Sequence, residues 1–327
     1  MNHAGIAESM RFKDLIGNAG LRKSLLTAFR AGRTHSTYLF LGKDGIGKWT
    51  TARALVAAAW CEQPDENGDC GQCPSCVKLA QDVHPELRLV DATERIIKID
   101  QIRELTEWLW LKGFSTGRRI LLVDAAERMN PQSQNCFLKT LEEPPPGAVI
   151  ILISANPGAL LPTIRSRCQK VRFLPPTHAE VMPLLVAGGF HAEAGQALLQ
   201  AADGSIRTLL RLLEDKQYFA FRREVVRRLA EPGDFFETGK WFAEQKEVLP
   251  EVFTLIASLL HDLMGLPYGS QPAAVDPEER TALTALAQRL HGRRMLEVLD
   301  EFVELRKRSA TNCNLQLCFE RFLLALV

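Results

Sequence analysis

The feature that most constrains this chain is the stretch at residues 38–50, which reads YLFLGKDGIGKWT. An apolar run at residues 38–41 precedes a glycine-rich loop, and the alanine-rich residues 51–60 favour a helix. The glycines and the lysine of the loop are Gly42, Gly45, Gly47 and Lys48. Glycines let backbone N–H groups turn inward, a helix N-terminus adds partial positive charge, and a lysine reaches the outer phosphates. The stretch predicts a strand, a phosphate-binding loop and a helix, with ATP or ADP as the expected ligand.

The position after the lysine departs from this motif. Phosphate loops place Ser or Thr there, whose hydroxyl binds Mg²⁺, whereas this chain has Trp49. Thr50 comes one residue later and is rotated by about 100° around the helix axis, so it does not simply replace the missing ligand. We expect Thr50 to border the nucleotide together with the loop glycines and Lys48, without ordinary Mg²⁺ coordination.

A second candidate strand ends in a carboxylate. Residues 119–124 read RILLVD, so an apolar run delivers Asp124 in the way that a strand brings a carboxylate to the Mg²⁺ of a bound nucleotide. The next residue is Ala125, at the position where hydrolytic members of this class place the glutamate that activates water. The pair of positions predicts a site that holds a nucleotide and hydrolyses little or none of it.

Further apolar runs at residues 87–90, 149–153 and 171–173 alternate with helical patterns, which predicts an α/β fold with a parallel sheet sandwiched between helices. From residue 177 onward the pattern is helical throughout. We expect a nucleotide-binding-type domain at residues 1–175, a small helical lid at 176–216 and an all-α domain at 217–327. Within the last of these, Arg222, Arg223, Arg227 and Arg228 are interpreted as a solvated helix face.

Four cysteines crowd the segment CEQPDENGDCGQCPSC, at Cys61, Cys70, Cys73 and Cys76. Gaps of two residues let neighbouring thiolates converge on one tetrahedral ion, and the preceding loop can fold back to supply the fourth ligand. The pattern predicts a closed, structural zinc site in an insertion spanning residues 61–76. The other interpretation is that these are unligated or redox-active thiols.

The charge balance limits the classes of function. Forty basic and thirty-nine acidic residues give a net charge of +1, so any contact with DNA should be local rather than a general basic coat. No stretch has the form of a signal peptide or an uninterrupted apolar run of the roughly 18 residues that a membrane span needs. We expect a cytoplasmic protein without a membrane partner.

The order of the motifs resembles one family. RFKDLIG, the phosphate loop, the cysteine insertion, HPE, IDQIREL, LLVDAAERMN, FLKTLEEPPPG and TIRSRC follow one another as in the bacterial clamp-loader subunits of the AAA+ class. The resemblance is strong over the first 175 residues and weaker in the helical remainder, where GSIR at residues 204–207 and the helix expected at residues 312–326 carry it. Trp49 and Ala125 are closer to the delta-prime branch of this family than to its ATP-hydrolysing motors.

This resemblance implies a mechanism and partners. The C-terminal helices would form a collar that joins the chain to motor subunits and a delta subunit in a ring that loads the sliding clamp on primed DNA. Arg167, within the motif SRC, would act in trans as an arginine finger at the ATP site of a neighbouring motor. Arg207 is the matching arginine of the lid and would contact the phosphates in this chain's own pocket. The other interpretation of Arg207 is a charged residue on the surface of the lid.

Two other functions remain open from the sequence. One is an ATP-hydrolysing motor subunit of the same loader, which an ATPase assay on the purified chain would distinguish. The other is a freestanding AAA+ regulator or a zinc-dependent DNA-binding module that joins no clamp loader. The chain carries no polymerase active site, and its own ATPase activity is expected to be weak or absent.

Overall fold

A computed structural model describes residues 11–65, 68–90, 95–111, 118–190, 192–266, 274–290, 292–311 and 313–327. These residues form two compact units. The first contains the chain up to Glu180 together with Ser205–Arg207, and the second contains Val181–Gly204 and Thr208–Val327. The division into a nucleotide-binding-type domain, a lid and a collar stays a prediction.

The first unit is built on a five-stranded sheet in the order β2-β3-β4-β1-β5, in which neighbouring strands pair in parallel. The strands are β1 (Thr37–Leu41), β2 (Leu87–Val90), β3 (Arg119–Val123), β4 (Ala148–Ser154) and β5 (Gln169–Arg172). Strands β3 and β4 are buried at every position, because helices cover both faces of a parallel sheet. At the edge, β5 buries only Val171.

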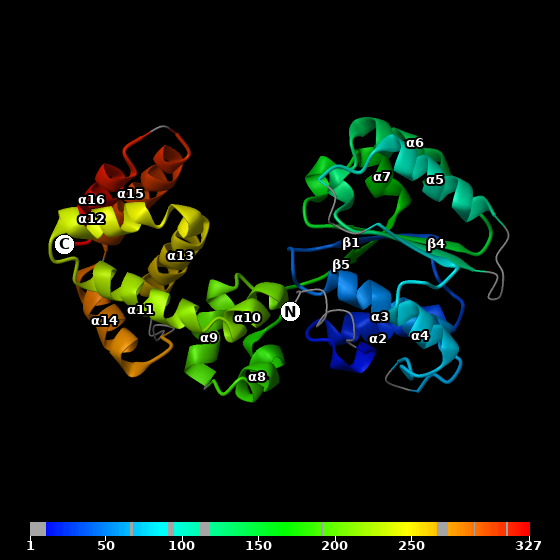
Figure 1. The fold of residues 1–327 in the computed structure, drawn as a ribbon, viewed down its shortest axis with the longest axis horizontal. Helices are drawn as coiled ribbons and strands as arrows, with labels where there is room; N and C mark the ends of the chain where they lie inside the picture. Colours follow the sequence, from blue (N-terminus) through cyan, green and yellow to red (C-terminus); the bar gives the residue numbers. More distant parts are fainter. Residues whose placement is uncertain are drawn as a thin grey trace. The chain divides into compact units, whose positions relative to one another are not determined.

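Helices cover the sheet on both sides (Figure 1). One layer contains α2 (Ala19–Arg30), α3 (Lys48–Trp60) and α4 (Pro74–Ala80), and the other contains α5 (Ile99–Trp110), α6 (Pro131–Glu142) and α7 (Pro162–Arg167). Successive strand residues point to opposite faces. Phe40 and Ile151 accordingly belong to the core beneath α2 and α3, whereas Leu39 and Ile150 belong to the core beneath α5 and α6. The predicted α/β sandwich is confirmed.

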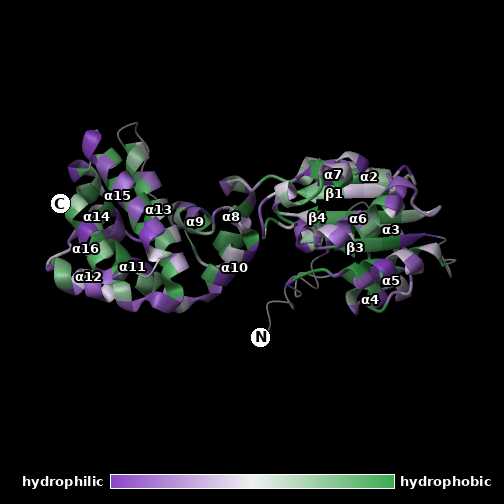
Figure 2. Cartoon of the chain, turned by 90° about the horizontal axis from the view of Figure 1, so that it is seen from above, coloured by the Kyte–Doolittle hydropathy of each residue, from purple (hydrophilic) through white to green (hydrophobic). Residues whose placement is uncertain are grey.

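The second unit is helical in its described residues. Its helices, two of which begin in the first unit, are α8 (His178–Ala187), α9 (Ala192–Ala201), α10 (Ile206–Glu214), α11 (Lys216–Ala230), α12 (Phe235–Glu244), α13 (Leu249–Gly265), α14 (Pro277–Arg289), α15 (Arg293–Ser309) and α16 (Leu315–Ala325). Figure 2 shows most of them two-sided, with hydrophobic residues (green) on one part of the surface and hydrophilic residues (purple) on another. Such helices bury one face against their neighbours.

The core of the second unit is rich in aromatic rings. Phe242 of α12 stacks on Phe319 of α16 with ring centroids 4.9 Å apart. A Cβ on Gly239 would lie 2.6 Å from the side chain of Glu320, so the two helices approach closely because this position has no side chain. The expectation of a solvated arginine face is wrong for Arg222, which is 1% exposed and pairs with a buried glutamate.

One described segment, Lys246–Gly265, is long and apolar enough to cross a membrane by length and composition alone, with a mean hydropathy of 1.4. It comprises a short 3₁₀ turn followed by α13. Its apolar side chains form the centre of the helical core, including Val252, Ile256 and Leu259. Burial inside the unit accounts for the hydropathy of this segment.

Candidate functional site

The phosphate loop has the predicted strand, loop and helix arrangement. Strand β1 ends at Leu41 and α3 begins at Lys48. The three glycines between them have φ values of +149° at Gly42, +73° at Gly45 and +90° at Gly47, which L-residues with side chains rarely adopt. A Cβ on Gly42 would also come within 2.7 Å of the Phe173 carbonyl oxygen. The loop therefore needs glycine both for its backbone conformation and for close packing.

Lys48 lies folded against its own loop. Its side chain is 5% exposed, and Nζ donates hydrogen bonds to the carbonyl oxygen of Gly42, at 2.7 Å, and to that of Lys43. Burial lowers the pKa of Lys48, and the nearby carboxylates of Asp44 and Asp124 act in the opposite direction. The ammonium group is thus held against the first two residues of the loop, the element that surrounds the phosphates when such a motif binds a nucleotide.

Two carboxylates act on Lys48 from the residues after β3, and only the first of them, Asp124, was predicted from the sequence. Asp124 follows the end of β3, and burial raises its pKa although the Ala125 N–H donates to its Oδ1 at 2.9 Å. Glu127, which the sequence did not single out, also acts electrostatically on Lys48 and accepts a 3.1 Å hydrogen bond from the Ala155 N–H. The sequence signal for Glu127 was weak, because it stands two positions beyond the expected glutamate position.

The two residues after the lysine have different surroundings. Trp49 packs against the apolar core that α2 and α3 share with the sheet, so its role in the structure is packing. Thr50 is half-buried in the first turn of α3. Its contact with a nucleotide stays a prediction.

Arg207 comes to the phosphate loop from far along the chain, within the first unit. Its Nη1 lies 3.2 Å from Oδ2 of Asp44, and its backbone N–H donates to the Gly45 carbonyl oxygen at 3.2 Å. Ser205 packs so closely that a Cβ on Gly45 would lie 2.0 Å from its Oγ. The structure therefore brings Arg207 together with the loop, where it pairs with a carboxylate of the loop itself.

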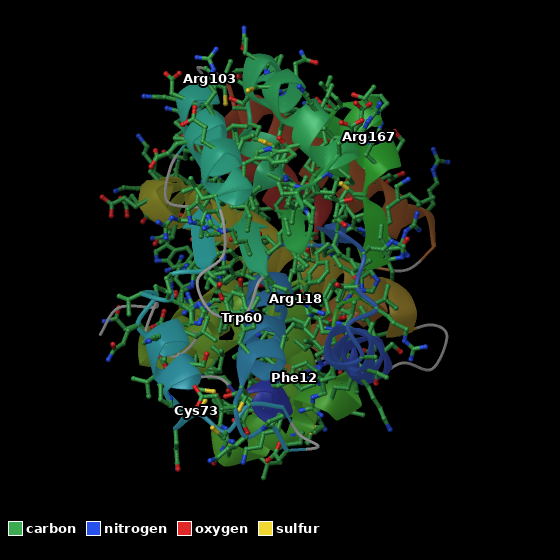
Figure 3. The ribbon with its side chains drawn as sticks, turned by 90° about the vertical axis from the view of Figure 1, so that its right-hand side faces the viewer. Phe12, Trp60, Cys73, Arg103, Arg118 and Arg167 are labelled. Carbon is green, nitrogen blue, oxygen red and sulfur yellow. The ribbon has the colours of Figure 1, made fainter. Side chains whose placement is uncertain are left out.

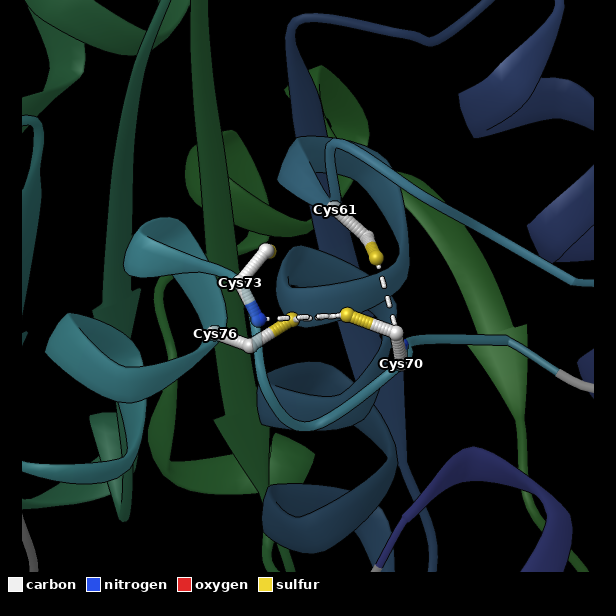
Figure 4. Close-up of side chains that lie close together, drawn as sticks. All are labelled: Cys61, Cys70, Cys73 and Cys76. Atoms are coloured by element: carbon white, nitrogen blue, oxygen red, sulfur yellow. Dashed lines mark hydrogen bonds between the residues drawn. The ribbon is translucent and has the colours of Figure 1, made fainter.

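The four cysteines predicted as metal ligands converge (Figure 4). Their sulfur atoms lie within 4.8 Å of one another. Four sulfur ligands around a zinc ion at about 2.3 Å would stand about 3.8 Å apart, so a small contraction of the cluster would form the tetrahedron. The residues Cys61, Cys70, Cys73 and Cys76 thus fit a metal ion such as zinc, with no open position for chemistry.

Backbone N–H groups already point at this sulfur cluster. The Cys70 N–H donates to Cys61 Sγ at 3.2 Å, and the N–H groups of Gln72 and Cys73 donate to Cys70 Sγ at 3.4 and 3.3 Å. The last two bonds lower the pKa of the Cys70 thiol to about 6, whereas burial raises the pKa of Cys61 and Cys76. Donors aimed at sulfur stabilise thiolate, which is the form that binds metal.

The insertion is fastened to the start of the described chain. Arg30 Nη2 donates to the carbonyl oxygens of Asp65 and Gly68, the latter at 3.0 Å, and Arg11 Nη2 donates to that of Asp69 at 2.6 Å. On its other side, His84 stacks on Trp60 with ring centroids 4.3 Å apart. Order in the cysteine insertion is thus linked to order in residues 11–14 and in α2.

Arg167 is the last residue of α7 and is 31% exposed. Its Nε donates to Glu142 Oε1 at 2.7 Å, its Nη2 pairs with the same oxygen, and its Nη1 donates to the Thr163 carbonyl oxygen at 2.9 Å. Its own carbonyl oxygen accepts a 2.7 Å hydrogen bond from the Thr37 hydroxyl. Side chain and backbone are therefore both held in place.

The contact with Thr37 locates Arg167 relative to the phosphate loop. Thr37 begins β1 and the loop follows Leu41 at the other end of that strand, so the two features are about 13 Å apart along the strand alone. Figure 3 shows Arg167 at the opposite end of the first unit from Cys73 as well. Arg167, the chain's own phosphate loop and the cysteine cluster are three separate places.

Comparisons with known proteins identify two family matches. A model described as "DNA polymerase III, delta subunit" matches residues 17–177, and one described as "DNA polymerase III, delta subunit, C terminal" matches residues 214–327. The chain is 38% identical to the delta' subunit of DNA polymerase III from Pseudomonas aeruginosa, over 56% of this chain and 57% of that protein. It is 28% identical to the delta' subunit of Escherichia coli, over 92% of both chains.

Other relatives carry related names. The chain is 29% identical to the gamma subunit of DNA polymerase III from Buchnera aphidicola, over 67% of this chain and 63% of that protein. Its similarity thus spans less than two thirds of the Pseudomonas and Buchnera relatives. Among solved structures, a gamma subunit-related protein of Thermotoga maritima aligns with 92% of this chain and 98% of its own, at 20% identity and a TM-score of 0.44. The family expected from the motifs is confirmed: the chain belongs to the DNA polymerase III delta-subunit family and is similar to its delta-prime members.

Proposed function

We propose that this chain is a stator-like clamp-loader subunit of the delta-prime type, which assembles with motor subunits and a delta subunit to load the sliding clamp on primed DNA. The observation that carries the proposal is the position of Arg167, anchored at the end of the sheet opposite the chain's own phosphate loop. An arginine there is too far from its own nucleotide site to act on it. It serves phosphate chemistry only when the site belongs to a neighbouring subunit.

The chain's own phosphate loop lacks residues that ATP hydrolysis needs, as expected for a subunit that is not a motor. The loop retains its glycines and Lys48, but Trp49 packs into the core in place of a hydroxyl ligand for Mg²⁺. Ala125 stands where a motor needs a carboxylate to activate water. We infer that Gly42, Gly45, Gly47, Lys48, Thr50, Asp124 and Arg207 bind a nucleotide weakly and hydrolyse it slowly or not at all. A purified chain that hydrolysed ATP at a motor-like rate would contradict this.

The cysteine cluster has a structural part in this proposal. A zinc ion bound by the four thiolates would hold the insertion closed and, through Arg11 and Arg30, secure the start of the first unit. The ion would supply cross-linking and no reactive position. The proposed work of the complex, on DNA in the bacterial cytoplasm, needs no membrane contact from this chain.

Two experiments test separately whether the chain is part of a clamp loader and whether Arg167 acts as an arginine finger. A pull-down of the tagged chain with purified motor and delta subunits should recover a stable complex that loads the clamp on primed DNA. In that complex, Arg167→Ala should lower the ATPase rate by on the order of 10³-fold at the site that it completes. Arg165→Ala is the matched control, since Arg165 lies in the same helix and is also half-buried. If the Arg167→Ala variant assembles and the complex keeps its ATPase rate, the chain is still a clamp-loader subunit, but Arg167 is not an arginine finger.

A further inference from the structure

Three nitrogen atoms of Arg167 have acceptors among the described residues, two of them on one oxygen. Nε and Nη2 share Glu142 Oε1, and Nη1 bonds the Thr163 carbonyl oxygen. A guanidinium group carries five N–H donors, one on Nε and two on each Nη. With one used on each nitrogen, two donors remain, and each terminal nitrogen carries one of them. Two such donors on neighbouring nitrogens are the groups with which an arginine can bind two oxygens of a phosphate at once.

Glu142 stands where helix electrostatics disfavours an acid. It is the last residue of α6, and the C-terminal end of a helix carries partial negative charge. Arg167, at the C-terminal end of α7, has the charge that such an end favours. The charge preference of a helix end therefore does not explain why residue 142 is a glutamate. Its two bonds to the guanidinium group of Arg167 do explain it.

The two helices that carry this pair are rigidly joined. Gln134, 3% exposed in α6, donates from Nε2 to the Ala159 carbonyl oxygen at 3.1 Å and accepts the Leu161 N–H at 2.7 Å. Phe137 of α6 and Ile164 of α7 are fully buried in the same core. Glu142 therefore reaches Arg167 from a fixed support, which is the condition for orienting a flexible side chain.

We propose that Glu142 is a positioning residue for Arg167, which orients the guanidinium group so that its two remaining N–H donors face outward for an oxyanion. The inference rests on the proposed function, in which that oxyanion is the γ-phosphate of a nucleotide bound to a neighbouring subunit. The carboxylate acts through Nε and one hydrogen of Nη2 and does not touch the phosphate. It reduces the number of rotamers that Arg167 explores before the neighbouring site is complete.

The test uses the reconstituted clamp loader with this subunit replaced by variants. Glu142→Gln removes the charge and keeps the size of the side chain, and we expect kcat for ATP hydrolysis to fall about 10-fold with KM nearly unchanged, because positioning is lost and ground-state binding is not. Glu143→Gln is the matched control, since Glu143 is the next residue, is exposed and should keep the wild-type rate.

A double variant separates positioning from a merely structural role. If Glu142 works through Arg167, Glu142→Gln combined with Arg167→Ala should be no slower than Arg167→Ala alone. A further loss in the double variant, or a wild-type kcat for Glu142→Gln where Arg167→Ala is slow, would overturn the positioning role and leave the finger standing. An unchanged rate for Arg167→Ala would overturn the finger and the positioning role together.

Discussion

The hydroxyl of Thr37 donates a 2.7 Å hydrogen bond to the carbonyl oxygen of Arg167, which joins the first residue of β1 to the last residue of α7. Strand β1 leads at its other end into the phosphate loop. One strand therefore separates the phosphate loop, where we propose that a nucleotide binds, from the arginine that we propose acts at the site of another subunit. A change at the start of β1 bears on the arginine first, because the phosphate loop is a strand length away.

Replacement of Thr37 by valine tests this contact. Thr37→Val keeps the shape of the side chain and leaves the Arg167 carbonyl oxygen without its donor, so we expect the free energy of unfolding to fall by about 1–3 kcal/mol. Urea unfolding of the full chain and hydrogen exchange of β1 amides measure the effect. Thr27→Val is the control, because Thr27 is exposed and bonds only within α2. Equal effects of the two substitutions would contradict the role of the contact.

Asp44 would compete with the phosphates of a bound nucleotide for the guanidinium group of Arg207. It pairs with Arg207 at 3.2 Å, and both side chains are mostly exposed, at 77% and 62%, so the pair is worth at most about 1 kcal/mol. Asp44→Asn should therefore strengthen ADP or ATP binding roughly two- to five-fold. Titration of the isolated chain with a fluorescent nucleotide measures it. Asp82→Asn, at a carboxylate paired with Arg53, should leave the affinity unchanged, and weaker binding by Asp44→Asn would count against the idea.

The strands and the loop were predictable because their signals are local. The apolar runs at residues 87–90 and 149–153 lie within β2 and β4, and the glycines mark where β1 gives way to α3. At the edge of the sheet the signal was offset: the expected strand at 171–173 is β5 at Gln169–Arg172, because an edge strand needs only one inward residue.

Pairings between distant residues were not predictable, because periodicity does not record which helix packs on which. The sequence singled out Arg167 through its motif but gave no sign that Glu142 is its partner, because their contact requires α6 and α7 to pack side by side. Arg222 lies in a run of arginines that favoured a solvated face, yet α14 covers it with a glutamate. The position of Arg207 against the phosphate loop likewise depends on how the chain returns to the first unit.

The cysteine cluster should hold one zinc ion per chain, measured by elemental analysis. Cys76→Ser should lower the zinc content and reduce the melting temperature by about 5 °C or more, because metal binding contributes directly to folding free energy. Hydrogen exchange should also quicken at Phe12, whose N–H lies 3.5 Å from Asp69 Oδ1 of the insertion. Cys136→Ser, outside the cluster, should keep the zinc. Full zinc content in Cys76→Ser would refute the four-thiolate site.

The ionised side chain of Asp124 should lower the free energy of unfolding at neutral pH. Burial raises its pKa in the folded chain, so the folded state holds the proton more tightly than the unfolded state, and the cost is complete above the folded pKa. As pH falls through the folded pKa towards the ordinary value for aspartate, the cost disappears. Asp124→Asn should stabilise the chain on the order of 1 kcal/mol at pH 7, with the gain shrinking in acid. Asp100→Asn, at an exposed carboxylate, should show no such trend in thermal unfolding.

The buried ion pair of the second unit gives the largest expected effect. Arg222 is 1% exposed and Glu279 is 0% exposed, with Nε 2.8 Å from Oε1, and the carboxylate raises the pKa of Arg222 against the opposing effect of burial. Glu279→Gln removes the carboxylate that is hydrogen-bonded to the buried guanidinium group, and we expect a loss of about 3–5 kcal/mol in urea unfolding. Glu224→Gln removes a carboxylate paired with Arg227 and Arg228 at the surface, and should cost no more than about 1 kcal/mol.

A double replacement shows whether the loss comes from burying the guanidinium charge without the Glu279 carboxylate or from the lost attraction between the two side chains. Arg222→Met with Glu279→Leu removes both charges and keeps apolar volume between α11 and α14, so it should recover most of the stability lost in Glu279→Gln. If the double variant is as unstable as the single one, the pair contributes attraction that packing does not replace. Similar stabilities for Glu279→Gln and Glu224→Gln would show that water reaches Arg222, contrary to its burial in this structure.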